Sequence, residues 1–396
     1  MSKTIMIVGA GFGQVPAIEK AKDLGYQVIA IDKNPDAIGM SKADISLAVD
    51  IIDIKEVVNV AKEYNIDGIM TMQSDIAVPG VGAVVDALSL NGVGLIVANR
   101  CSNKIEAREL FEKANVPQPD FRVIDTLQEA LVASKLIGYP CVIKAPDSSG
   151  SRGITKVNNE SEVLKAFDEG KKYSRIGKLL VEDFVDGEEI GAQAFSRNGK
   201  CIKVLVHNDT ISNPPFMIPT GHSFPSFLSD EIRLIAEKAC KNAVEAIGIS
   251  SGPSNIDLIL SKDGTPMIIE IGARIGATCL PELVKYHTGI DWVEQTIKSC
   301  LGEDVDLTNT KDEAVAALIL ESPQDGVLKS FTAPDTIRNS SVLEWEMTAV
   351  SLDEVHKLRK GTDRIGKIIV IAENVKEAEA EAMKIKSKFQ YKIDEK

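Results

Sequence analysis

The stretch NIDLILSKDGTPMIIEIGAR, residues 255–274, decides how the middle of the chain folds. Two apolar runs flank residues 261–264 (SKDG), whose composition is typical of a tight turn, and this pattern predicts an antiparallel hairpin. The hairpin would bring Asp257 and Glu270 together, and two neighbouring carboxylates repel unless a cation lies between them. Carboxylate oxygens suit Mg²⁺, which takes one or two of them and then substrate phosphates. The stretch therefore predicts a metal site, with a structural ion pair to Arg274 as the alternative.

Length and composition describe an ordinary globular protein of two or three domains. The chain has 396 residues, of which 44% are hydrophobic and 26% charged. Its formal net charge of −13 argues against a nucleic-acid partner and against binding to an anionic membrane surface. No apolar run approaches the roughly 18 residues that a membrane-spanning helix needs. We therefore expect no nucleic acid and no membrane among its partners.

Cysteine and histidine usage bears on compartment and on metals. The six cysteines are scattered without a C-x-x-C pair, and the N-terminus MSKTIMIVGAG is typical of a first strand rather than a signal peptide. These features predict reduced thiols and a cytoplasmic protein. No two of the four histidines lie at the sequence spacing of metal ligands, which argues against a histidine metal centre.

Strand and helix signals alternate through residues 1–100, which predicts a parallel sheet with right-handed crossovers. The first strand ends in GAGFG, residues 9–13, and the second ends at Asp32. This arrangement invites a dinucleotide site, but Gln14 stands where the motif needs its third glycine. A small-molecule pocket and plain turn geometry are the other interpretations. Asp75 follows a later strand at the sheet edge where such folds bind ligands, so it is a substrate candidate.

The segment CVIKAPDSSGSRG, residues 141–153, places Lys144 inside an apolar strand. An unpaired buried lysine is costly, so we expect Lys144 to face a cleft with an anionic ligand. The Ser/Gly loop that follows can present backbone N–H groups to phosphate oxygens, and Arg152 adds positive charge. The alternative is a lysine whose ammonium reaches solvent from a strand edge.

The segment LLVEDFVDGEE, residues 179–189, delivers Glu182 at the end of an apolar strand, with Phe184 beside it. Carboxylates next to an aromatic ring could accept hydrogen bonds from an adenine amino group and from ribose hydroxyls. Exposed acids near a turn are also common without a ligand.

Residues 207–227, HNDTISNPPFMIPTGHSFPSF, are rich in proline and aromatic side chains. His207, His222 and Ser223 in this segment are candidates for substrate contacts. Packed histidines with satisfied hydrogen bonds are the competing interpretation.

Taken in order, the lysine with its Ser/Gly loop, VEDFVDGEE and IDLIL…IIEIGAR resemble the ATP-grasp carboxylate–amine ligases over roughly residues 100–285. The flanking regions resemble the purine-biosynthesis, biotin-carboxylase-like and L-amino-acid-ligase branches. The resemblance implies a multidomain α/β and α+β fold. Its expected parts are a Rossmann-like pre-ATP-grasp domain (1–100), a two-lobed ATP-grasp domain (101–310, with a lid at about 118–190) and a small C-terminal α+β domain (311–396).

The resemblance also implies roles for individual residues. Arg274 and Lys144 would act on the transferring phosphoryl group, and Asp257 and Glu270 would hold Mg²⁺ or Mn²⁺. The residues expected to bind ATP are Lys104, Lys144, Ser149, Gly150, Ser151, Gly153, Glu182, Phe184, Val185 and Glu189. Two positions depart from the family pattern: Gly272 replaces a usual asparagine, and Asp183 a frequent lysine.

The implied activity is ADP-forming: ATP converts a substrate carboxylate to an acyl phosphate, and an amine then displaces phosphate. Expected partners are a small-molecule carboxylate and amine, and a homodimer is the expected assembly. Three alternatives stay open, namely a carboxylase acting through carboxyphosphate, a non-catalytic ATP-binding regulator favoured by Gly272, and a nicotinamide-dependent oxidoreductase.

Overall fold

The computed structural model describes residues 2–148, 152–213 and 216–395. Contacts group the chain into two units, which are described separately. Unit 1 comprises Met1–Leu205, Asp230–Gly276 and Trp292–Leu307, and unit 2 comprises Val206–Ser229, Ala277–Asp291 and Thr308–Lys396. The domain boundaries expected at residues 100 and 310 stay predictions.

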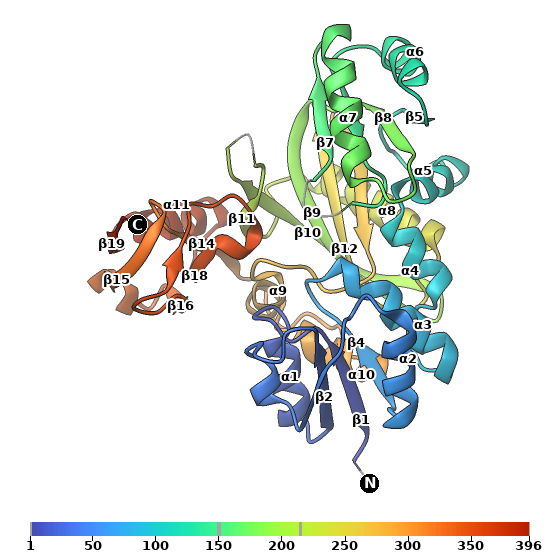
Figure 1. The fold of residues 1–396 in the computed structure, drawn as a ribbon. Coiled ribbons are helices and arrows are strands. Elements are labelled where there is room, and N and C mark those ends of the chain that lie inside the picture. The colour runs from blue at the N-terminus through green and yellow to red at the C-terminus, as the bar shows by residue number, and fades with distance from the viewer. Residues whose placement is uncertain (1, 149–151, 214–215, 396) are drawn as a thin grey trace. The chain divides into compact units, whose positions relative to one another are not determined.

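A four-stranded parallel sheet opens unit 1, as the alternating pattern predicts. Its strand order is β3 (Ile45–Ala48), β2 (Gln27–Asp32), β1 (Thr4–Val8) and β4 (Gly68–Met70). Helix α1 (Val15–Asp23) lies on one face, and α2 (Ile54–Glu63) and α3 (Val78–Leu88) lie on the other (Figure 1). Met6 and Val8 of β1 are buried in one cluster with apolar residues of α2 and α3. The parallel arrangement leaves the carboxyl ends of the strands at one edge.

The glycines of residues 80–82, which in the sequence are typical of a connection between elements, lie inside α3, and α4 (Leu95–Ser102) follows. Both glycines are buried inside α3. A Cβ at Gly82 would lie 2.9 Å from the Cβ of Ala98 in α4. The glycine therefore permits close packing of two helices, and this benefit outweighs its low helix propensity.

The lid region forms an antiparallel sheet with the order β5 (Phe121–Ile124), β8 (Leu179–Asp183), β6 (Cys141–Lys144) and β7 (Ile154–Val157). Helices α6 (Leu127–Ile137) and α7 (Val163–Tyr173) share a buried cluster with Ile143 and Val181. Because strand side chains alternate between faces, Lys144 and Glu182 lie on the opposite face from that cluster.

The predicted hairpin is present at the second lobe of unit 1. Strand β12 (Gly252–Ser261) pairs antiparallel with β13 (Pro266–Gly272) on one side and with β9 (Gly187–Arg197) on the other. Helices α8 (Asp230–Ile247), α5 (Lys104–Lys113) and α10 (Trp292–Cys300) complete the unit. Asn103 caps α5, since its side chain accepts a hydrogen bond from the N–H of Ile105 at 3.1 Å.

The chain passes from unit 1 to unit 2 within β10 (Lys200–Ile211). In unit 2 the strand order is β11 (Pro219–Phe224), β14 (Ala314–Glu321), β18 (Arg364–Ala372) and β16 (Val342–Met347), and each strand is antiparallel to its neighbour. A smaller sheet has the order β17 (Glu354–Val355), β15 (Gly326–Thr332) and β19 (Gln390–Asp394), and the helices are α9 (Leu280–Thr288) and α11 (Val375–Lys386). Among the described residues, no helix is long and apolar enough to cross a membrane.

Candidate active site

A buried cluster of charges joins the lid sheet to α5. The ammonium Nζ of Lys144 lies 2.6 Å from Oε2 of Glu182, and Nε of Arg108 lies 2.8 Å from Oε1 of the same carboxylate. Burial alone would raise the pKa of Glu182, but Arg108 and Lys144 outweigh it and lower that pKa to about 2. Burial and the nearby cations lower the pKa of Lys144 to about 8, although Glu182 opposes the shift. The expected cleft lysine is therefore paired with Glu182.

Arg108 is a site residue that the sequence reasoning missed. Besides Glu182, its guanidinium donates to the carbonyl oxygens of Ile268 and Ile269 at 3.0 and 2.9 Å. Arg108 thus ties β8 to β13 and fixes the distance between the lid strand and the hairpin. The sequence did contain a signal for Arg108 as a site residue, because it lies one helical turn after Lys104 and therefore on the same face of the helix.

The predicted carboxylate pair lies directly opposite across the hairpin. Asp257 is the register partner of Glu270. Like charges in this position destabilise a sheet, so a cation is needed nearby. Lys104 supplies one, since its Nζ lies 3.0 Å from Oε1 of Glu270 and also donates to the carbonyl of Ser148 at 2.9 Å. Lys104 therefore links the start of the Ser/Gly loop to the carboxylate pair.

Neighbouring amides orient Asp257. Nδ2 of Asn255 donates to Oδ1 of Asp257 at 3.0 Å, and Oδ1 of Asn255 accepts from Nε2 of Gln193 at 2.7 Å. Oε1 of Gln193 in turn accepts from the backbone N–H of Gly276 at 3.1 Å. This chain of hydrogen bonds connects β9, β12 and the turn after β13, so the Asp257 carboxylate is held in a defined direction.

Arg274 forms a bidentate pair with Asp75, not with either hairpin carboxylate. Nε and Nη2 of Arg274 lie 2.8 and 3.0 Å from Oδ1 and Oδ2 of Asp75. Burial would raise the pKa of Asp75, but Arg274 and Lys104 outweigh it and lower that pKa. A Cβ at Gly272 would lie 2.8 Å from Oδ1 of Asp75. Glycine at position 272, where the family usually has asparagine, therefore leaves room for the Asp75 carboxylate.

The structure places the remaining predicted ATP residues around the lid. The ring of Phe184 has the ammonium of Lys156 3.5 Å from its centroid, and Val185 is half-buried. Glu189 is the register partner of Ile259 in β12. The carbonyl of Gly153 accepts from the N–H of Ala145 at 2.9 Å. The predicted residues Ser149, Gly150 and Ser151 lie outside the described residues.

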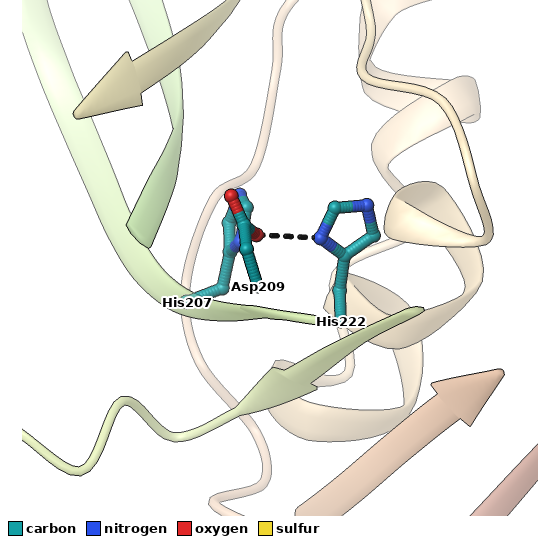
Figure 2. A group of neighbouring side chains, drawn as sticks. All are labelled: His207, Asp209 and His222. Atoms are coloured by element: carbon teal, nitrogen blue, oxygen red, sulfur yellow. Dashed lines mark hydrogen bonds and ion pairs between the residues drawn. The ribbon is translucent and has the colours of Figure 1, made fainter. Parts of the chain in front are cut away.

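In unit 2, two of the predicted substrate residues come together. His207, Asp209 and His222 form one group, shown in Figure 2, although the two histidines are not at ligand spacing in the sequence. Ser223 points elsewhere, since its hydroxyl donates to Oε1 of Glu379 at 2.6 Å.

The GAGFG turn has the contacts of a structural turn. The Asp32 carboxylate accepts hydrogen bonds from the N–H groups of Ala10 and Asn34, each at 2.8 Å. The Gln14 side chain accepts from the N–H of Gly11 at 3.0 Å and donates to the carbonyl of Met72 at 2.6 Å. These contacts favour turn geometry over a ribose-binding role for Asp32.

The fold and this site together define an ATP-grasp protein. Residues 103–308 match the family model described as carbamoyl-phosphate synthase L chain, ATP binding domain. The match spans more than half of the chain, so the chain belongs to that family, and the resemblance inferred from the motifs is confirmed.

Individual relatives agree with this assignment. An alanine–anticapsin ligase of Bacillus subtilis is 24% identical over 315 residues, covering 74% of this chain and 66% of the relative. A formate-dependent phosphoribosylglycinamide formyltransferase of Aliivibrio fischeri is 30% identical over 285 residues, covering 65% of this chain and 66% of the relative. The alignments thus span about two thirds of these relatives' lengths. The crystal structure of phosphoribosylglycinamide synthetase from Anaerococcus prevotii has a TM-score of 0.86 and 28% identity, with complete coverage of both chains. The predicted fold class is confirmed.

Proposed function

We propose that this protein is an ATP- and Mg²⁺-dependent ligase that activates a small carboxylate as an acyl phosphate and joins it to an amine, releasing ADP. One observation carries the proposal: Lys104 contacts both the start of the Ser/Gly loop and Glu270, whose register partner is Asp257. Phosphate-binding groups and carboxylates suited to a cation therefore meet at one place within an ATP-binding family. The ligase names of relatives support the same activity.

The carboxylate pair fits a hard divalent cation. Asp257 is exposed and the Glu270 side chain is 35% exposed, so both can reach a ligand, and their oxygens suit Mg²⁺ or Mn²⁺. When bound, the ion would neutralise charge on the phosphates of ATP. The hydrogen bonds from Gln193 through Asn255 hold Asp257 ready for this role.

The positive side chains have separate tasks in this proposal. Lys144 and Lys104 bind phosphate oxygens, and Arg274 stabilises charge on the transferred phosphoryl group. Since Arg108 and Lys144 occupy the Glu182 carboxylate, the adenine contacts at this strand come from backbone groups near Val185.

The other proposed ATP contacts involve the ring of Phe184, the carboxylate of Glu189 for ribose, and the lid loop with Ser149, Gly150, Ser151 and Gly153. His207, His222, Ser223 and Asp75 remain substrate candidates. A homodimer in the cytoplasm remains the expected assembly and location.

The test measures ADP release with Mg²⁺ and ATP across a panel of amino acids and small carboxylates, singly and in pairs. We expect release that needs both an acid and an amine, with a product lighter than their sum by one water. Release with bicarbonate and an amine alone would instead identify a carboxylase. ATP binding with no release from any pair would identify a regulator.

A matched pair of variants tests the metal assignment. Glu270→Gln removes one proposed ligand charge, and we expect ADP release to fall by about 10²–10³-fold. The control Asp263→Asn changes an exposed acid in the turn of the same hairpin and should leave the rate unchanged. Equal rates in both variants would refute the role of Glu270.

A further inference from the structure

The β10–β11 ladder in unit 2 brings three metal-ligand side chains together. Strand periodicity puts His207 and Asp209 on the same face of β10, and the register places His222 opposite Asp209. Nδ1 of His207 and Nδ1 of His222 lie 2.8 and 2.6 Å from the same oxygen, Oδ1 of Asp209. Figure 2 shows both imidazoles beside this carboxylate.

His207 is buried without the hydrogen bonds that a buried imidazole needs. Its exposed fraction is 2%, and among the described residues neither ring nitrogen has a hydrogen-bond partner. Its Nδ1 is within ion-pair distance of Asp209, but the contact lacks the geometry of a hydrogen bond. An unsatisfied buried group of this kind calls for a partner, and an ion or water bound by these side chains would supply one.

The chemistry of the three groups points to a transition metal. One ligand atom from each residue lies within 4.8 Å of the others, which gives two imidazole nitrogens and one carboxylate oxygen. Imidazole nitrogen suits Zn²⁺ and its first-row neighbours, whereas Mg²⁺ prefers oxygen ligands. We propose that His207, Asp209 and His222 bind one divalent ion of the Zn²⁺ class, with a fourth position open to water.

Aromatic rings pack against the histidine cluster. The His207 ring meets Phe224 edge-on with centroids 5.4 Å apart, and Phe224 stacks on His287 at 5.1 Å. The ion would hold β10 to β11 at this point of the hairpin.

This site is separate from the proposed Mg²⁺ pair, whose ligands are all carboxylate oxygens. The inference does not rest on the ligase proposal, and its test uses no nucleotide. A bound ion would replace the substrate role of His207 and His222, but the proposed Mg²⁺ and ATP contacts would be unaffected.

The test uses the full chain after treatment with a chelator and dialysis. Zn²⁺ and Co²⁺ are titrated without ATP, and bound metal is measured by elemental analysis and by the visible absorption of Co²⁺. We expect one ion per chain, retained in a large excess of Mg²⁺. Separate His207→Gln, Asp209→Asn and His222→Gln variants should each weaken binding by at least about 100-fold.

The matched control is His356→Asn, which removes an exposed imidazole that lies near Asp325 and Glu354. It should bind the ion as the unmodified chain does. Uptake of no ion by the unmodified chain, or equal affinity in the three cluster variants, would overturn the proposal and leave a buried histidine–carboxylate cluster without an ion.

A second measurement avoids variants that unfold the hairpin. X-ray absorption of Zn²⁺ bound to the unmodified chain should give nitrogen and oxygen ligands at about 2.0–2.1 Å. Sulfur ligands at about 2.3 Å would place the ion at cysteines and overturn the assignment.

Discussion

Replacing Glu182 with glutamine tests whether the buried charge cluster holds the lid sheet to α5. The carboxylate lies between Arg108 and Lys144, and all three side chains are at most 4% exposed. Glu182→Gln keeps the size of the side chain but leaves two buried cations without an anion. Breaking a buried ion pair in this way costs about 3–5 kcal/mol.

The pKa values give an independent magnitude and a pH dependence. Lowering the pKa of Glu182 from 4.5 to about 2 stabilises the folded protein by about 3 kcal/mol at neutral pH. This contribution is present above pH 4.5 and is lost as pH falls toward 2, because the folded-state pKa is the lower one. The pKa of Lys144 is also lowered, from 10.5 to about 8, so its charge destabilises the fold below pH 8. That cost disappears as pH rises from 8 to 10.5.

The assay is urea denaturation of the full chain at neutral pH and at several acidic values. The control is Asp183→Asn, which neutralises the exposed neighbour of Glu182. We expect Glu182→Gln to lose about 3–5 kcal/mol at neutral pH and less as the solution is made acidic, and the control to lose under about 0.5 kcal/mol. A loss below about 1 kcal/mol in Glu182→Gln would refute the reasoning.

Three further predictions concern the site. A Gly272→Ala side chain would meet Oδ1 of Asp75 at 2.8 Å, so we expect thermal denaturation to show a loss of about 2 kcal/mol. An unchanged melting temperature would show that the Asp75 carboxylate moves without cost. Because the pKa of Lys144 is about 8, its charge is lost as pH rises through that value, and equilibrium binding should show ATP affinity falling there. Lys144→Arg should bind ATP evenly across this range, since arginine stays charged; a break at pH 8 in that variant would contradict the assignment. The ammonium of Lys156 lies over the ring of Phe184, which we propose contacts ATP. Lys156→Met removes this cation and should weaken ATP binding by about two- to fivefold in a fluorescence titration. Unchanged affinity would place adenine elsewhere.

The sequence was sufficient to predict elements whose signal is local. The hairpin that carries Asp257 and Glu270 follows from two apolar runs and a turn of fitting composition, and the register places the two carboxylates opposite each other. The cost of burying an unpaired lysine likewise indicated that Lys144 would face a cleft. Local periodicity and turn chemistry act within a few residues, so one sequence is enough to see them.

Contacts between distant segments were beyond this reasoning. Arg108 lies on a charged helix, where an arginine is usually exposed, and only the packing of α5 against β8 and β13 buries it. His207 and Asp209 share a strand face by simple spacing, but His222 joins them through a ladder with a bulge after Thr210. A bulge shifts the register, so counting residues could not place His222.

Glycine was misread for a related reason. Gly82 belongs to a glycine pair that is typical of a connection in the sequence, yet it lies inside α3, where the close approach of Ala98 requires it. Gly272 looked like a lost metal contact, whereas the nearby Asp75 carboxylate explains it. In both cases the neighbour that makes glycine necessary belongs to another segment.

The most direct test of the central claim follows the oxygen atoms of the substrate carboxylate. The acid panel is labelled with heavy oxygen in its carboxyl groups and incubated with Mg²⁺, ATP and hydroxylamine as a general amine. If the acid passes through an acyl phosphate, one carboxyl oxygen bonds to the γ-phosphorus and leaves with phosphate when the amine displaces it. We therefore predict that mass spectrometry will find one heavy oxygen in the released phosphate, together with a hydroxamate. ADP release with unlabelled phosphate would contradict the account.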